Sequence, residues 1–122
     1  MKKLIYFISL CLVVIMLSAC EKSNNQLENM TTQESNDYIA IIWKDRVYVP
    51  FCAINNSGRG TQIGIVDGDK NDQVYEYKNH STEDWIISLY KSGEMDTSML
   101  MKEINVKQIP NNLQSDYKWN NQ

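Results

Sequence analysis

The sequence predicts a mainly β fold: a small antiparallel sheet or half-barrel of about six strands, which follows a signal peptide and a flexible tether. Three observations lead to this prediction. Short segments rich in β-branched and aromatic residues recur from residue 38 onward, turns rich in Gly, Asn and Asp separate them, and 122 residues can bury only one core. The length also excludes a multidomain enzyme, a transporter bundle and a repeat array.

The first two segments predict a hairpin. Residues 38–43 are apolar on both alternating faces, as in a central strand, although a short buried helix has the same pattern. Residues 44–46 form a compact polar break, and residues 47–51 are again rich in strand formers. Because Pro50 has no amide donor, the second strand should end there, lie at an edge or bulge.

Four further strands are predicted, at residues 61–66, 73–78, 85–90 and 99–109. In the second of these, a period of two places Tyr75 and Tyr77 on one face and Val74 on the other. Residues 67–72 and 91–94 are the predicted turns, and a short helical turn is expected at residues 95–98. Ser81 followed by Asp84 could cap another helical turn, but the aromatic and β-branched residues after it favour a strand.

The first 20 residues form a targeting segment. Lys2 and Lys3 precede an apolar run over residues 4–17 that only Ser9 interrupts, which fits a secretory signal and is short for a bilayer span. The ending Leu-Ser-Ala-Cys at residues 17–20 resembles the lipobox of bacterial lipoproteins. This resemblance implies cleavage before Cys20 and a diacylglycerol on its sulfur, although an ordinary secretion signal with an incidental cysteine is an alternative. We therefore expect a lipid-anchored protein on the extracytoplasmic face of the cell membrane.

The chain thus divides into four parts. These are a lipoprotein signal peptide (residues 1–19), the lipidated Cys20 with a disordered polar tether (20–37), a β-rich domain (38–110) and a loosely held polar tail (111–122). Cys11 lies in the signal segment and Cys20 carries lipid, so Cys52 alone remains and no internal disulfide is expected. Between Phe51 and Ala53, Cys52 is expected to be a small buried hydrophobe and not a reactive thiol.

Charge and motifs argue against catalysis and nucleic-acid binding. The net charge is −3, and without the two lysines of the signal segment ten basic groups face fifteen acidic ones, which disfavours a phosphate backbone. Asp67, Asp69 and Asn71 begin like a calcium loop, but Asp72 stands where glycine is needed and Lys78 where a bidentate Glu is needed. His80 is the only histidine, and no nucleophile motif accompanies it. We expect no enzyme, metal, cofactor or small-molecule substrate.

Aromatic side chains with polar tips are the candidate binding residues. The chain has more of them than a small domain can easily hide, and such side chains anchor many interfaces. The predicted binding residues are Tyr48, Tyr75, Tyr77 and Trp85. The alternative is that they are half-buried strand residues that cover the core.

Segments 41–48, 63–66 and 74–87 carry a further resemblance. Their order (a strand ending in Tyr, an Ile-Gly strand, a Val-Tyr strand and a Ser-x-Glu segment before an apolar strand) is similar to small Gram-positive lipoproteins, including the nisin and subtilin immunity lipoproteins. This resemblance implies a lipid-anchored β domain that intercepts a cationic antimicrobial peptide. We therefore expect a non-enzymatic binding module for a peptide or protein, with a structural or accessory subunit of a cell-envelope complex as the alternative.

Overall fold

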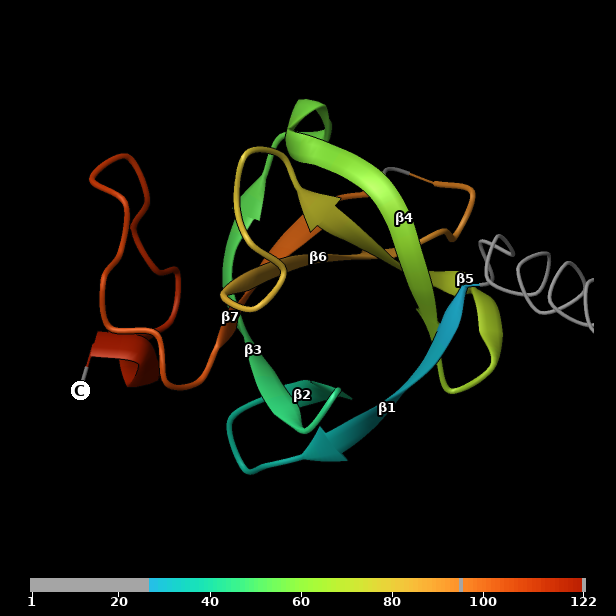
Figure 1. Cartoon of the computed structure of the whole chain (residues 1–122), viewed down its shortest axis with the longest axis horizontal. Helices are drawn as coiled ribbons and strands as arrows, with labels where there is room; N and C mark the ends of the chain where they lie inside the picture. The colour runs from blue at the N-terminus through green and yellow to red at the C-terminus, as the bar shows by residue number, and fades with distance from the viewer. Residues whose placement is uncertain (1–26, 95, 122) are drawn as a thin grey trace, which may run out of the picture.

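Alternating segments and tight turns build seven strands, which close into a barrel (Figure 1). The structure is a computed structural model that describes residues 27–94 and 96–121. The strands are β1 (Glu28–Glu34), β2 (Ile39–Trp43), β3 (Arg46–Ile54), β4 (Arg59–Val66), β5 (Asp69–Tyr77), β6 (Trp85–Tyr90) and β7 (Ser98–Glu103). Their order around the barrel is β1-β2-β3-β7-β6-β5-β4. The predicted mainly β class is confirmed, with the sheet closed on itself. The signal peptide and Cys20 lie outside the described residues.

β1 closes the barrel, and this strand was predicted as part of the tether. It pairs antiparallel with β2 and parallel with β4, where Met30 lies beside Val66. Its side chains are exposed except that of Met30, which is 1 % exposed and belongs to the inner core. One inward apolar side chain is enough to seat an otherwise polar strand, because the backbone pairs on both edges. The tether prediction is therefore wrong for residues 28–34.

Gly64 on β4 allows β1 to approach. A Cβ atom at this position would lie 2.7 Å from the Glu28 carbonyl oxygen and 2.8 Å from the Met30 Cε atom. Both distances are shorter than van der Waals contact, so only glycine fits without displacement of β1.

The predicted hairpins are present, with some boundaries moved. Lys44 and Asp45 adopt positive φ angles of 50° and 62°, which form the two-residue turn between β2 and β3. Pro50 sits at a bulge, where the register of β3 on β7 shifts, and β3 continues to Ile54. Residues 67 and 68 alone make the β4–β5 turn, so Asp72 lies in a strand and not in the predicted turn.

Side chains alternate between an inner and an outer core. The inner cluster fills the barrel with Met30, Ile41, Tyr48, Val66, Val74, Ile86 and Met101. The outer cluster lies on the other face of the same strands and contains Phe51, Cys52, Trp85, Ile87 and Leu100. The predicted separation of Val74 from Tyr75 and Tyr77 is confirmed, because Val74 is in the inner cluster and both tyrosines pack on the outer one.

The C-terminal segment covers the outer cluster and departs from two predictions. β7 ends at Glu103, so the strand predicted to residue 109 is shorter, and Ile109 and Leu113 pack on the outer cluster. The Asp116 amide donates to the Phe51 carbonyl at 2.8 Å, and the Ala53 amide donates to the Asp116 carboxylate at 3.0 Å. The tail, which ends in the short helix η2 (Lys118–Asn121), lies beside β3 in Figure 1 and is not loosely held.

Ser98 begins β7, so the predicted helical turn at residues 95–98 does not include it. Within residues 27–94 and 96–121, no helix has the length and apolar character that a bilayer crossing requires.

Candidate binding site at the open end of the barrel

One end of the barrel is closed by the chain itself. Tyr48 is fully buried inside the barrel, and its hydroxyl donates a hydrogen bond to the Thr82 carbonyl at 2.7 Å, which ties the β5–β6 connection to this end. Burial, to which the charge of Glu103 adds, raises the pKa of Tyr48 to about 12, so the hydroxyl keeps its proton. An ion pair between Arg46 and Glu83 at 3.3 Å joins the same connection to β3.

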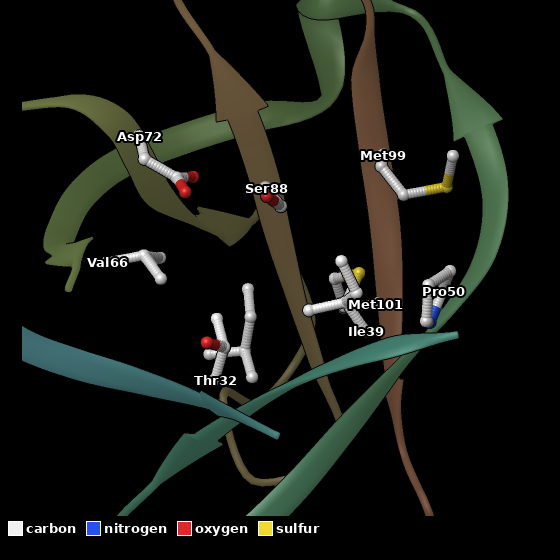
Figure 2. Close-up of a pocket in the computed structure, with 9 residues that line it drawn as sticks. Thr32, Ile39, Pro50, Val66, Asp72, Ser88, Met99 and Met101 are labelled. Atoms are coloured by element: carbon white, nitrogen blue, oxygen red, sulfur yellow. The ribbon is translucent and has the colours of Figure 1, made fainter. Parts of the chain in front are cut away.

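The opposite end holds a cavity of about 190 Å³. All seven strands contribute residues to its wall (Figure 2). The lining residues are Thr32, Ile39, Ile41, Pro50, Val66, Asp72, Ser88, Met99 and Met101. Ile39, which is 56 % exposed, and the exposed Thr32 place the rim of this cavity at the surface. We call this opening the mouth.

Strand register explains why these side chains face inward. Residues directly opposite in an antiparallel pair point to the same face, and every second residue does so along a strand. Val74 lies opposite Ser88, and Ser88 lies opposite Met99, which forms one inward layer across β5, β6 and β7. The next layer outward pairs Asp72 with Tyr90, which is 57 % exposed. Asp72 therefore stands at the rim, one layer above Ser88.

Among the described residues that line the mouth, Asp72 is the only one with an ionisable side chain. Its carboxylate is directed toward Ser88 in Figure 2, and no side chain of residues 27–94 and 96–121 pairs with it by a hydrogen bond or an ion pair. Burial, and then the charges of Asp69 and Asp67, raise the pKa of this carboxyl above its ordinary value. The mouth thus combines an apolar floor with an unpaired acid at its rim.

The β4–β5 turn fixes the acidic side of the rim against β1. The Thr32 hydroxyl donates to the Asp67 carboxylate at 2.9 Å, and the Gly68 amide donates to the Asn29 side-chain oxygen at 2.7 Å. The Asp69 carboxylate accepts from the Asn71 amide at 2.9 Å, which orders the start of β5. Two of the three acids near the mouth therefore have partners, whereas Asp72 has none in the described chain.

The predicted binding residues do not share one exposed face. Tyr48 lies in the inner core, and Trp85 is 3 % exposed in the outer core, where its ring meets Phe51 edge-on at 5.1 Å. Tyr75 and Tyr77 are half-buried against the same outer cluster. The prediction that Tyr48 and Trp85 are surface anchors is wrong, because the alternation of side chains along each strand turns both of them toward a core. The alternative prediction, that these are strand residues that cover the core, fits both.

The other reactive side chains have structural surroundings. Cys52 is buried, as predicted, and burial followed by the charge of Asp116 raises the pKa of its thiol, which favours the unreactive protonated form. The His80 ring stacks on Tyr77 at 4.1 Å, and its Nδ1 atom lies 2.8 Å from the Lys78 carbonyl. In the described part of the chain, no group of three or more His, Cys, Asp or Glu side chains is arranged to hold a metal ion.

A second hollow, of about 310 Å³, lies on the outside of the barrel. It is lined by Gln33, Glu34, Ser35, Tyr38, Ala40, Val47 and Ile104. The Tyr38 ring is tilted against that of Trp119, with centroids 4.6 Å apart, and Trp119 stacks on Tyr117 at 5.2 Å, so the tail contributes aromatic rings beside this hollow. These three aromatics and the residues of the mouth were not among the predicted binding residues. For Asp72, the signal was available, since the period of two through Val74 extends to it.

The chain matches no known family model, and no curated protein or solved structure is similar to it. Fold and cavity together define a small closed β-barrel with one end sealed and the other open, acidic at the rim and apolar below.

Proposed function

We propose that this protein is a membrane-anchored, extracytoplasmic and non-enzymatic binding module whose mouth receives part of a peptide or protein. The open cavity, to which all seven strands contribute, carries this proposal. A cationic antimicrobial peptide is the ligand that fits the acidic chain and the resemblance to immunity lipoproteins.

Cavity size favours a side chain over a whole small molecule as the occupant. Sites for drug-sized ligands are typically about 300–1,000 Å³, whereas an apolar cavity of about 150 Å³ is enough for benzene. At about 190 Å³ the mouth lies close to the second value. One apolar side chain, presented by a larger partner, fills such a space.

The anchor would hold the mouth near the bilayer. Seven residues separate Cys20 from β1, which begins at Glu28, and an extended chain of this length spans at most about 28 Å. A barrel held so close would meet membrane-active peptides where they accumulate. Mass spectrometry of the protein from membranes should find acyl chains on Cys20, and Cys20→Ala should release the protein; an unmodified Cys20 would remove the membrane from the proposal.

The binding test uses the full chain in lipid nanodiscs and a synthetic amphipathic peptide rich in Lys and Leu. Ser88→Leu fills the mouth, and Thr61→Leu, at an exposed position on β4, is the matched control. We expect binding to weaken at least about tenfold in the first variant only, because buried contacts worth about 1.4 kcal/mol or more are lost. Circular dichroism checks that both variants fold. Equal binding by both variants, or no binding by the unaltered chain, would contradict the proposal.

An accessory role in a cell-envelope complex is the second candidate. The outer hollow supports it, because Ile104 is 47 % exposed there beside Tyr38 and could pack against a fixed partner. Ile104→Asp should then abolish cross-linking to that partner in cells, while peptide binding at the mouth stays unchanged.

A further inference from the structure

The position of the Asp72 carboxylate within the depth of the mouth restricts which kind of ligand the mouth can bind. The floor is apolar, from Ile41 and Met101, and Ser88 lies one layer above Met101. The carboxylate of Asp72 lies higher, in the rim layer. A long amine inserted tip first would bring its ammonium against the apolar floor, where an unpaired charge is costly. An apolar group inserted with its charge at the rim meets complementary surfaces at both depths.

The rim also selects the sign of the charge. Asp72 has no donor among the described residues, and the charged groups that act on it are Asp69 and Asp67. The other titratable side chain facing it is the phenol of Tyr90, from the opposite position on β6. A ligand cation would replace water at this carboxylate and offset the repulsion from the two neighbouring acids.

We infer that the mouth binds an apolar side chain with a positive charge beside it, the side chain on the floor and the cation against Asp72. The ligand is a cationic peptide, which rests on the proposed function and deepens it. The N-terminal residue of a peptide has this arrangement when its side chain is apolar, because the α-ammonium and the side chain share one Cα atom. A lysine next to an apolar residue supplies the same chemistry.

Three small ligands separate the contribution of the positive charge to the affinity from that of the apolar group. Leucinamide has the isobutyl group and the α-ammonium, N-acetyl-leucinamide lacks the charge, and glycinamide lacks the apolar group. Each is titrated into the full chain in detergent micelles, with ¹³C-methyl labels on methionine so that the Met99 and Met101 signals report on the mouth. Leucinamide should shift these signals saturably, and each of the other two should bind about tenfold more weakly, as expected for one charge-assisted contact or one buried aliphatic group.

Two variants test which residues of the mouth bind the charge and the apolar group of the ligand. In Asp72→Asn, which keeps the shape of the side chain, leucinamide and N-acetyl-leucinamide should bind within about twofold of each other. In Ser88→Leu, none of the three ligands should shift the signals. Acetyl-Leu-Lys-amide, whose charge lies on the neighbouring residue, shows whether a lysine replaces the α-ammonium; tight binding of either cation supports the inference.

Failure of the inference differs from failure of the proposed function. If acetylation leaves the affinity of the unaltered chain unchanged, or if Asp72→Asn keeps the preference for the cation, the charge pairing is wrong although the mouth binds a side chain. If none of the ligands moves the Met99 and Met101 signals and the amphipathic peptide does not bind either, both the inference and the proposed function fall.

Discussion

The two ends of the barrel are built from the same strands but treat their polar groups in opposite ways. At the closed end, the Tyr48 hydroxyl is paired with the Thr82 carbonyl, and Arg46 is paired with Glu83. At the mouth, Asp72 has no partner within the described chain, and burial raises its pKa. A buried polar group that is paired stabilises a fold, whereas a half-buried carboxylate without a partner weakens it and is available to a ligand. The first end therefore maintains the barrel and the second is suited to binding.

The largest expected effect is at the closed end. Tyr48→Ala removes a fully buried aromatic ring from the inner core and should lower the free energy of unfolding by about 3–5 kcal/mol. Tyr48→Phe keeps the ring but leaves the Thr82 carbonyl without its donor, which should cost about 1–3 kcal/mol. At the mouth, Ser88→Ala should change the free energy of unfolding by less than about 0.5 kcal/mol. Urea denaturation measures all three, and equal costs at Tyr48 and Ser88 would remove the contrast between the ends.

The high pKa of Tyr48 adds a check on the same variants. In the unfolded chain a tyrosine ionises near pH 10, but in the folded chain Tyr48 does so only at about 12. The folded state therefore binds more protons in this range, and stability should fall as the pH rises from 10 toward 12. The free energy of unfolding of Tyr48→Phe should fall less steeply with pH over that range. Identical slopes for the variant and the unaltered chain would mean that the hydroxyl is not buried as described.

Closure of the barrel by β1 should show the next largest effect. Gly64→Ala places a Cβ atom in contact with the Glu28 carbonyl and the Met30 side chain, so about 1–3 kcal/mol of stability should be lost. Because β1 supplies Thr32 to the mouth, amide exchange of β1 and peptide binding should both be affected. Thr61→Ala, on the same strand but exposed, is the control. If Gly64→Ala leaves amide exchange in β1 unchanged, the strand does not depend on this close approach.

Local sequence signals predicted much of the wall of the barrel but little of what closes it. Alternation placed Tyr75 and Val74 on opposite faces, and the missing amide donor of Pro50 predicted a bulge as one of three outcomes. β1 was missed because its composition is that of a tether, and the single Met30 that seats it is recognisable only once β4 lies beside it. The tail was missed for the same reason, since Leu113 has no local pattern and packs on strands far away in the chain.

The mouth was less accessible to sequence analysis than the strands. Its lining comes from seven strands, and no short motif can encode such a set. Asp72 was assigned to a turn because acids and Asn surround it, yet Asp67 and Gly68 alone make that turn through positive φ angles. Extending the period of two from Val74 would have placed Asp72 inside, but its inward direction has meaning only after the barrel closes.

The outer wall provides a test that should affect neither end. Leu113→Ala removes a half-buried contact with the outer cluster and should cost about 1–2 kcal/mol, less than a fully buried leucine would. Peptide binding at the mouth should remain within about twofold, because the outer cluster lies on the other side of the sheet. Urea denaturation and the nanodisc binding assay give the two values. A large loss of binding would show that the tail is coupled to the mouth.

The smallest expected effect has the opposite sign. Because the folded-state pKa of Asp72 is raised, the folded chain holds its proton above the pH at which the unfolded chain, with a pKa of about 3.9, loses it. This carboxyl therefore lowers stability as the pH rises through that interval, and Asp72→Asn should raise the melting temperature near pH 7 but not below pH 3. Thermal melts at both pH values measure the difference. A saturating cationic ligand should reduce the gain at pH 7, because it neutralises the same charge in the unaltered chain. If Asp72→Asn is less stable at pH 7, the carboxylate has a partner that stabilises the fold and is not available to a ligand.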